Sequence, residues 1–99
     1  MDQSSDPPHL AVVILNYNGA ELLETFLPLV IQHSKGHSVV VADNCSQDHS
    51  RQLLREQFPE VHLIELDQNW GFSGGYNKAL SALKADYYVL LNSDVEVTP

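Results

Sequence analysis

Residues 86–96 read DYYVLLNSDVE, and this stretch decides the fold. Tyr87 to Leu91 is an uninterrupted apolar run, too short to span a membrane and of the length of a strand buried on both faces. It stops at Asn92-Ser93-Asp94, where an amide, a hydroxyl and a carboxylate follow one another. All three residue types favour turns, so a plain turn is one explanation of the triplet. The other is a ligand site, because open α/β sheets bind ligands at the carboxyl ends of their strands.

Three earlier segments end in the same way. Leu10–Leu15 and Ser38–Ala42 are β-branched apolar runs, and polar residues follow each of them at once. Val61–Leu66 alternates weakly between apolar and polar residues, which predicts a strand at the edge of a sheet, and it leads into another polar segment.

Helical patterns separate these strands. Apolar residues recur at helical spacing over 20–33, and Pro28 predicts that this helix kinks or splits after Leu27. The second helix is expected to be capped by Asp48 or Ser46. Its predicted buried residues are Leu53, Leu54 and Phe58.

The third helix is expected to open at Ser73 or Gly74, with one apolar face formed by Tyr76, Ala79, Leu80 and Leu83. Strands and helices thus alternate as β-α-β-α-β-α-β, which predicts an α/β fold with a parallel sheet. All carboxyl strand ends then lie along one edge of the sheet. The residues expected to share a crevice there are Tyr17, Asp43, Asn69 and Asp94.

Composition limits the possible functions. The chain has 99 residues, 43% of them hydrophobic, which fits one small globular domain. Its net charge of −8, with five Lys and Arg, argues against binding nucleic acid through a basic surface. The same scarcity of cations implies that a bound phosphate would need a metal ion to balance its charge. No apolar run approaches the ~20 residues of a transmembrane helix.

The amino-terminal segment and the cysteine content point to a location. Residues 1–9 are acidic and rich in proline, so we expect a disordered lead-in and not a signal peptide. Cys45 is the only cysteine, which excludes a disulfide within the chain and fits a reducing compartment. We therefore expect a cytoplasmic protein, or one held at the inner face of the membrane.

Each crevice residue has a functional and a plainer explanation. Asp43 can accept a hydrogen bond from a base imide or a ribose hydroxyl, or simply end a strand. Tyr17 can stack on a nucleobase or pack like any aromatic residue. The glycines around Gly74 can bring backbone N–H groups close to a phosphate, or only start a helix. Lys78 is expected to be solvated, and Cys45 to be a small buried thiol.

The sequence argues against a dinucleotide site of the Rossmann type. Its G-x-G-x-x-G motif should follow the first strand, where residues 16–20 read NYNGA. The glycines of this chain come two strands too late, and the GxxxxGK[ST] motif of a P-loop is absent from the sequence.

Four ordered motifs resemble the family 2 inverting glycosyltransferases, and most closely their rhamnosyltransferase-like branch. They are VVILNYNG at 12–19, VVVADNCSQDHS at 39–50, NWGFSGGYN at 69–77 and LLNSDVEV at 90–97. The resemblance implies the nucleotide-binding half of a GT-A fold over residues 10–99, with a mostly parallel sheet of order 3-2-1-4. It implies transfer of a sugar from a UDP- or dTDP-sugar to a glycan or lipid-linked acceptor. The alternative is a non-catalytic or degenerate α/β nucleotide-binding module.

The resemblance also implies roles for residues. Asn16 and Tyr17 would line the base pocket, and Asp43 would accept a hydrogen bond from a uracil or thymine imide. Asp94 would bind Mg²⁺ or Mn²⁺, although Asn92 stands where the family's Asp-x-Asp motif usually begins. Asn92 is then a ribose contact or supports the metal ligand. The other predicted contacts with the donor are Asn44, Asn69, Gly74 and Asn77.

The same resemblance places the general base and the acceptor-binding half beyond residue 99. We therefore expect the 99-residue chain to be inactive alone, with no catalytic residue among those assigned. A strand at 87–91 would lie at the edge of the sheet, where unpaired backbone groups could pair two copies into a homodimer.

Overall fold

The computed structural model describes residues 10–34, 36–83 and 87–92, in which strands and helices alternate. The predicted lead-in at residues 1–9 lies outside these ranges. The elements in chain order are β1 (Leu10–Asn16), α1 (Ala20–His33), β2 (Ser38–Asp43), α2 (Ser50–Gln57), β3 (His62–Glu65), α3 (Gly71–Ser81) and β4 (Tyr87–Asn92).

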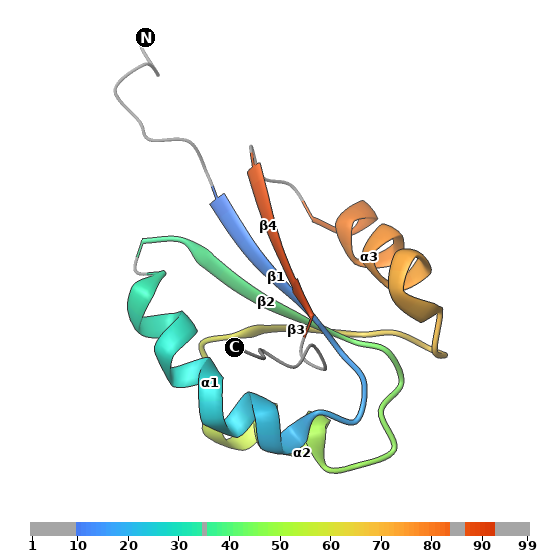
Figure 1. The fold of residues 1–99 in the computed structure, drawn as a ribbon, viewed down its shortest axis with the longest axis horizontal. Coiled ribbons are helices and arrows are strands. Elements are labelled where there is room, and N and C mark those ends of the chain that lie inside the picture. The colour runs from blue at the N-terminus through green and yellow to red at the C-terminus, as the bar shows by residue number, and fades with distance from the viewer. Residues whose placement is uncertain (1–9, 35, 84–86, 93–99) are drawn as a thin grey trace, which may run out of the picture.

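The four strands form one parallel sheet in the order β3-β2-β1-β4, with β1 and β2 in its centre (Figure 1). The register sets Asn16 opposite Asp43, and Asp43 opposite Glu65. On the other side of β1, Leu15 lies opposite Asn92. The strands therefore end almost level at one edge. The predicted fold class and strand order are confirmed.

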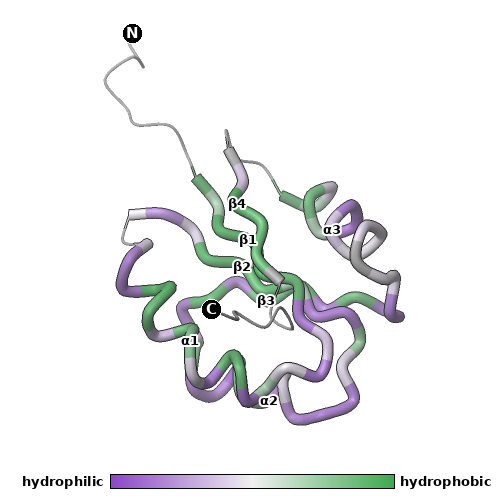
Figure 2. Tube along the Cα trace, in the orientation of Figure 1, coloured by the Kyte–Doolittle hydropathy of each residue, from purple (hydrophilic) through white to green (hydrophobic). Residues whose placement is uncertain are grey.

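Helices cover both faces of the sheet, with α1 and α2 on one face and α3 on the other (Figure 1). Val12 and Ile14 of β1 belong to the core under α1 and α2, whereas Val13 and Leu15 belong to the core under α3. Since both faces are covered, the central strands are hydrophobic between their polar ends, over 10–15 in β1 and 39–42 in β2, as Figure 2 shows. The helices alternate between hydrophobic and hydrophilic residues in the same view.

The core residues predicted for α2 and α3 are confirmed. Leu53, Leu54 and Phe58 are buried under one face of the sheet, and Tyr76 and Ala79 under the other. Leu80 and Leu83 are half-buried and pack against the same core cluster as Tyr76 and Ala79.

Of the kink or split predicted after Leu27, the split is wrong, because α1 runs through Pro28 as one helix. Pro28 has no N–H to donate to the carbonyl of Glu24, but both residues are exposed. The Glu24 carbonyl thus lacks this donor at a position exposed to water, while Leu23 and Leu27 stay buried on a neighbouring face of the helix. Packing of this buried face holds the helix together.

Other boundaries differ by one to three residues from those predicted. α3 begins at Gly71 instead of Ser73 or Gly74, and β3 covers only His62–Glu65. β3 and β4 are the edge strands, as predicted. None of the helices within the described ranges is long and apolar enough to cross a membrane.

Candidate functional site

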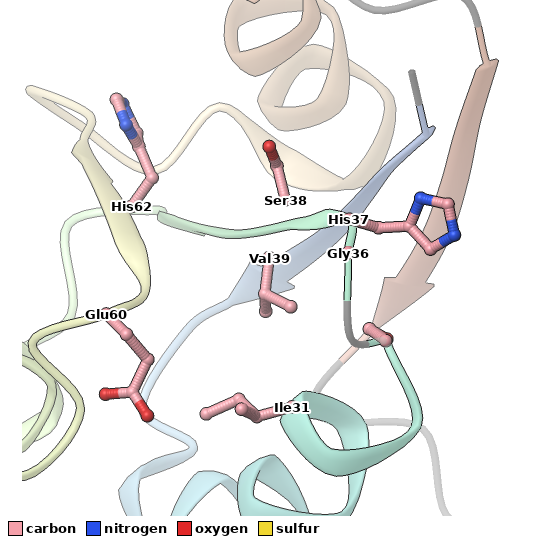
Figure 3. Close-up of a pocket in the computed structure, with 8 residues that line it drawn as sticks. Ile31, Gly36, His37, Ser38, Val39, Glu60 and His62 are labelled. Atoms are coloured by element: carbon pink, nitrogen blue, oxygen red, sulfur yellow. The ribbon is translucent and has the colours of Figure 1, made fainter. Parts of the chain in front are cut away.

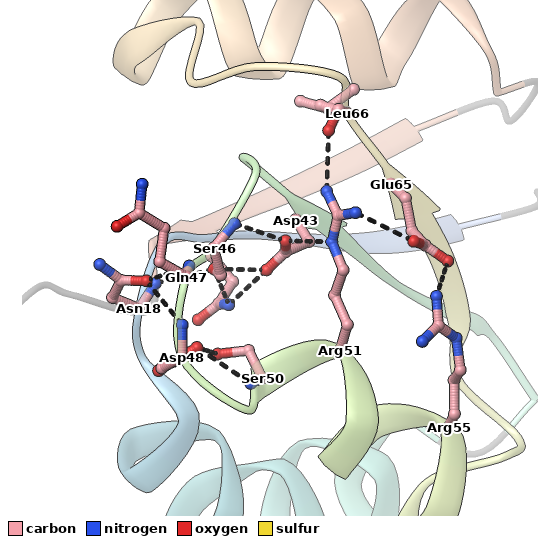
Figure 4. A network of polar contacts seen from close by, with 11 residues as sticks. Asn18, Asp43, Ser46, Gln47, Asp48, Ser50, Arg51, Arg55, Glu65 and Leu66 are labelled. Atoms are coloured by element: carbon pink, nitrogen blue, oxygen red, sulfur yellow. Dashed lines mark hydrogen bonds and ion pairs between the residues drawn. The ribbon is translucent and has the colours of Figure 1, made fainter.

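The carboxylate of Asp43 lies at the centre of the sheet's carboxyl edge and is fully buried. Its Oδ1 accepts hydrogen bonds from Asn16 Nδ2 at 2.8 Å and from Ser46 Oγ at 2.6 Å. Its Oδ2 accepts from the backbone N–H of Ser46 at 2.9 Å and from Arg51 Nε at 2.7 Å (Figure 4). A carboxylate has about four lone-pair sites, so these donors fill it. This pairing is what allows a charge to be buried here.

Arg51 is the functional residue that the sequence reasoning missed. Besides Asp43, it donates from Nη1 to Glu65 Oε1 at 3.0 Å and from Nη2 to the carbonyl of Leu66 at 2.8 Å. The hydrogen bond to Asp43 raises the pKa of Arg51 above its usual value. The scarcity of cations was an available signal, because Arg51 is one of only five Lys and Arg in the chain and follows Asp43 by eight residues.

Asn18 latches the loop after β1 to the loop after β2. Its backbone N–H donates to Ser46 Oγ at 2.8 Å, and its Oδ1 accepts from the backbone N–H of Gln47 at 2.7 Å. Asn18 has φ +54°, a left-handed conformation that asparagine tolerates better than most residues. The two loops are therefore one bonded unit (Figure 4).

Asp48 joins the starts of two helices. Its Oδ2 accepts from the backbone N–H of Ala20, the first residue of α1, at 3.1 Å. Its Oδ1 accepts from the backbone N–H of Ser50 at 2.9 Å and from Ser50 Oγ at 2.5 Å, at the start of α2. Burial alone would raise the pKa of Asp48, but the hydrogen bonds from Ser50 and Ala20 outweigh it and lower the pKa. Asp48 thus satisfies the first N–H of α2, but the N-cap position itself is occupied by His49 and not by Asp48 or Ser46 as predicted.

Asn44 fixes the start of α3. It is buried, accepts from the backbone N–H of Trp70 at 2.9 Å and donates to the carbonyl of Gly71 at 3.0 Å. Asn69 accepts from the backbone N–H of Gly71 at 2.8 Å. Gly71 has φ +76°, which glycine adopts without strain. These bonds explain why α3 begins earlier than its apolar pattern indicates.

Close packing accounts for one of the glycines in this segment. Gly75 is buried, and a Cβ there would lie 2.7 Å from Leu15 Cδ1 and 3.0 Å from Asn44 Nδ2. A Cβ on Gly74 would meet only Trp70 Cβ, at 3.1 Å. Gly75 is therefore needed to bring α3 onto β1, whereas Gly74 stays half-exposed beside the crevice.

The predicted contact residues divide into buried and exposed groups. Asn16, Asp43 and Asn44 are buried and bonded to one another's loops. The side chains of Tyr17 (37% exposed), Asn69 and Asn77 are exposed and open to a ligand.

Asn92 ends β4 beside Leu15, but its side chain is outside the described part of the structure. Asp94, the predicted metal ligand, lies outside the described residues altogether. Within 10–34, 36–83 and 87–92, no group of three His, Cys, Asp or Glu is placed to hold a metal ion.

Of two expectations for neighbouring side chains, one is confirmed and one is wrong. Lys78 is exposed, as expected, and its Nζ also lies 4.2 Å from the centre of the Trp70 ring, in a cation–π contact. Cys45 is half-buried instead of buried, at φ +65° in the loop after β2.

A hollow of about 380 Å³ lies at the opposite edge of the sheet, between the end of α1 and the starts of β2 and β3. Its lining includes His37, Glu60 and His62, but the two imidazoles point away from each other (Figure 3). The polar network of Figure 4 lies at the other edge, so the hollow is separate from the predicted crevice.

A family comparison decides what kind of domain this is. The model of glycosyl transferase family 2 matches residues 11–99. The chain belongs to this family. The resemblance of its four motifs to family 2 glycosyltransferases is thereby confirmed.

Two curated relatives carry the names of glycosyltransferases. TuaG of Bacillus subtilis (strain 168), named for a glycosyltransferase of teichuronic acid biosynthesis, is 31% identical over 91 residues, which cover 88% of this chain and 36% of TuaG. An N-acetylglucosaminyl-diphospho-decaprenol L-rhamnosyltransferase of Mycobacterium tuberculosis is 28% identical, over 91% of this chain and 33% of that protein. The chain thus spans about a third of the length of these relatives.

Solved structures share the fold. The mannosyltransferase PcManGT from Pyrobaculum calidifontis, in complex with GDP-Man and Mn²⁺, matches with a TM-score of 0.74 and 25% identity, over 91% of this chain and 28% of PcManGT. TarS 1-349 from S. aureus, in complex with UDP-GlcNAc, matches with a TM-score of 0.73 and 23% identity, over 87% of this chain and 26% of that structure. The predicted GT-A fold is confirmed.

Proposed function

We propose that this chain is the donor-binding part of a glycosyltransferase that binds a nucleotide-diphosphate sugar at the carboxyl edge of β1, β2 and β3. The observation that carries the proposal is the bonded unit of two loops around the buried Asp43, with exposed Tyr17 beside it, in a chain of glycosyl transferase family 2. An edge held this rigidly is preorganised for a planar ligand, since little ordering remains to be done on binding.

The exposed side chains are the proposed direct contacts. Tyr17 stacks on the base, and Asn69 and Asn77 line the path of the sugar diphosphate. Gly74 is half-exposed near the start of α3, where backbone N–H groups and the positive helix end favour a phosphate. The Asn92 side chain at the end of β4 is the proposed ribose contact.

Asp43 is proposed to accept the base imide by exchanging one of its four present donors. Ser46 Oγ is the donor best able to leave, because a hydroxyl rotates freely and this side chain is only half-buried. Asn16 and Asn44 act indirectly, Asn16 by bonding the Asp43 carboxylate and Asn44 by holding the start of α3.

Asp94 is the proposed ligand for Mg²⁺ or Mn²⁺, with further oxygens from the diphosphate. When bound, a divalent cation stabilises the negative charge on the departing nucleoside diphosphate. The Mn²⁺ in the PcManGT complex supports this assignment. Asp94→Asn should remove the metal-dependent part of nucleotide binding, as measured with and without chelator.

The acceptor is proposed to be a glycan or a lipid-linked glycan, at the cytoplasmic face of the membrane. The decaprenol in the name of the mycobacterial relative supports a lipid-linked acceptor. None of the assigned residues acts as general base, and we place that residue beyond position 99.

Calorimetric titration of the protein at its native length with UDP, dTDP, GDP and ADP tests the proposal. We expect saturable binding of at least one, and sugar transfer from the corresponding nucleotide sugar. Binding without transfer would favour the non-catalytic module. No binding of any nucleotide would refute the proposal.

A further inference from the structure

One side chain joins the strand ends that border the proposed base site. Arg51 reaches β2 through Asp43 Oδ2 at 2.7 Å, and the end of β3 through Glu65 Oε1 at 3.0 Å and the Leu66 carbonyl at 2.8 Å (Figure 4). It does this from α2, whose first turn is bonded to Asp48. Its own side chain is 26% exposed, whereas that of Asp43 is fully buried.

The acceptors of Arg51 lead directly to the proposed contacts. Asp43 bonds Asn16, the residue before Tyr17, so its position sets where the tyrosine ring stands. Leu66 begins the segment that carries Asn69, and its backbone N–H donates to the carbonyl of Asp43 at 2.9 Å. The Arg51 guanidinium therefore spans the two sides of the base site without facing into it.

We infer that Arg51 is a positioning residue for base recognition, which fixes the Asp43 carboxylate and the separation between Tyr17 and Asn69. The inference rests on the proposed function and adds a determinant of base specificity to it. Arg51 acts through Asp43 and Leu66 and does not touch the nucleotide.

The contact geometry requires arginine. Three separate nitrogens of one planar group donate to three acceptors on two strands. A lysine ammonium is a single compact charge, so it can stay paired with Asp43 but cannot hold the Leu66 carbonyl in the same geometry. Arg51→Lys therefore separates the charge at Asp43 from the bridging of the strand ends.

Arg55 provides a matched control. It lies one turn further along the same helix and pairs with Oε2 of the same Glu65. Its side chain is 57% exposed, and among the described contacts it has none with Asp43 or Leu66. Arg55→Gln thus removes an ion pair from the same helix and strand but leaves the base site intact.

The test measures affinities for UDP, dTDP, GDP and ADP by calorimetry, in the wild type, Arg51→Lys and Arg55→Gln at native length. We expect Arg51→Lys to weaken the best-bound nucleotide about tenfold, the equivalent of one hydrogen bond to a charged group. We also expect its ratio of best to worst affinity to fall toward one. Arg55→Gln should keep both values within about twofold of the wild type.

The ratio of best to worst nucleotide affinity distinguishes a positioning role of Arg51 from a purely structural one, because a general loss of stability lowers all four affinities together. An unchanged ratio in Arg51→Lys, or a wild type without base preference, would overturn the inference and leave the proposed function standing. A wild type that binds none of the four would refute the proposed function itself. Arg51→Gln is a second variant, expected to show a larger loss of preference in the same assay if it folds.

Discussion

The two sides of the sheet's carboxyl edge are built to different degrees by this chain. At the ends of β1 and β2, polar side chains are buried and bonded, with Asn16 and Asp43 both 0% exposed. Along β4, apolar side chains face solvent, with Val89 at 41% and Leu90 at 46% exposure. The polar side chains at the ends of β1 and β2 are therefore bonded within the chain, whereas β4 leaves apolar surface open.

This difference has a physical basis. A buried polar group is tolerated only when its partners are in place, so the network around Asp43 must form together with the fold. An exposed apolar edge strand, by contrast, is a surface for another strand or chain. Base recognition should accordingly depend on residues of this chain. The apolar surface of β4 should instead depend on another strand or chain that covers it.

The largest expected effect is that of removing the Asp43 carboxylate, the hub that bonds Asn16, Ser46 and Arg51 together. Asp43→Ala leaves the Arg51 charge and the Asn16 amide without their buried partner, so we expect a loss of about 3–5 kcal/mol in the free energy of unfolding. Urea denaturation measures this. The control Glu56→Ala, at an exposed position, should change the value by about 0.5 kcal/mol or less. A loss below about 1 kcal/mol for Asp43→Ala would contradict the hub role.

A smaller loss is expected where α3 meets β1. Gly75→Ala places a methyl 2.7 Å from Leu15 Cδ1, and overpacking of this kind typically destabilises by about 1–3 kcal/mol. Gly74→Ala is the matched control, since its 3.1 Å contact is offset by the better helix propensity of alanine, about 1 kcal/mol. Thermal unfolding measures the stability of the two variants. Equal stability of Gly75→Ala and Gly74→Ala would show that α3 can shift to admit the methyl.

Much of this fold could be predicted from local sequence. The apolar runs at 10–15 and 38–42 indicated strands covered on both faces, and the alternation with helical patterns indicated the parallel sheet. The run at 87–91 was also predicted to be buried on both faces, and this is wrong, because Val89 and Leu90 of the edge strand β4 are exposed. The start of α3 was missed because it is set by the side chain of Asn44, far away in sequence. The continuity of α1 through Pro28 was missed because it depends on which face of the helix is exposed.

The candidate site was predictable in position but not in detail. The polar residues at strand ends placed Asn16 and Asp43 at one edge, since parallel strands end together. That Asp43 is surrounded by four donors, and that Arg51 supplies one of them, follows from tertiary contacts that leave no local pattern.

Because apolar side chains of β4 are exposed, we expect the 99-residue chain to self-associate. Its exposed apolar edge should pair with a second copy, so light scattering at micromolar concentration should show a dimer or larger species. Leu90→Lys should return the chain to a monomer, because a charged side chain opposes edge pairing. A wild-type chain that stays monomeric would show that the edge is covered. We also expect this chain alone to transfer no sugar.

The smallest effect concerns pH. Hydrogen bonds from Ser50 and Ala20 lower the pKa of Asp48 in the folded state, so its contribution to stability is present above its ordinary pKa of about 3.9. That contribution is lost as the pH falls through the lower folded value. The stability difference between wild type and Asp48→Asn should therefore shrink in acid, although solvent screening keeps it small. The same difference at pH about 3 and about 7 would contradict a lowered pKa of Asp48 in the folded state.

We place a nucleobase at the edge of the sheet where the loops after β1 and β2 are bonded to each other. The nucleotide affinity of Tyr17→Ala at native length tests this placement most directly. Calorimetry should show a loss of about 1–3 kcal/mol in binding free energy for the nucleotide that the wild type prefers, because stacking on the ring is lost. Leu22→Ala, at an exposed apolar position on α1, should bind as the wild type does. An undiminished affinity in folded Tyr17→Ala would contradict the placement of the base at this edge.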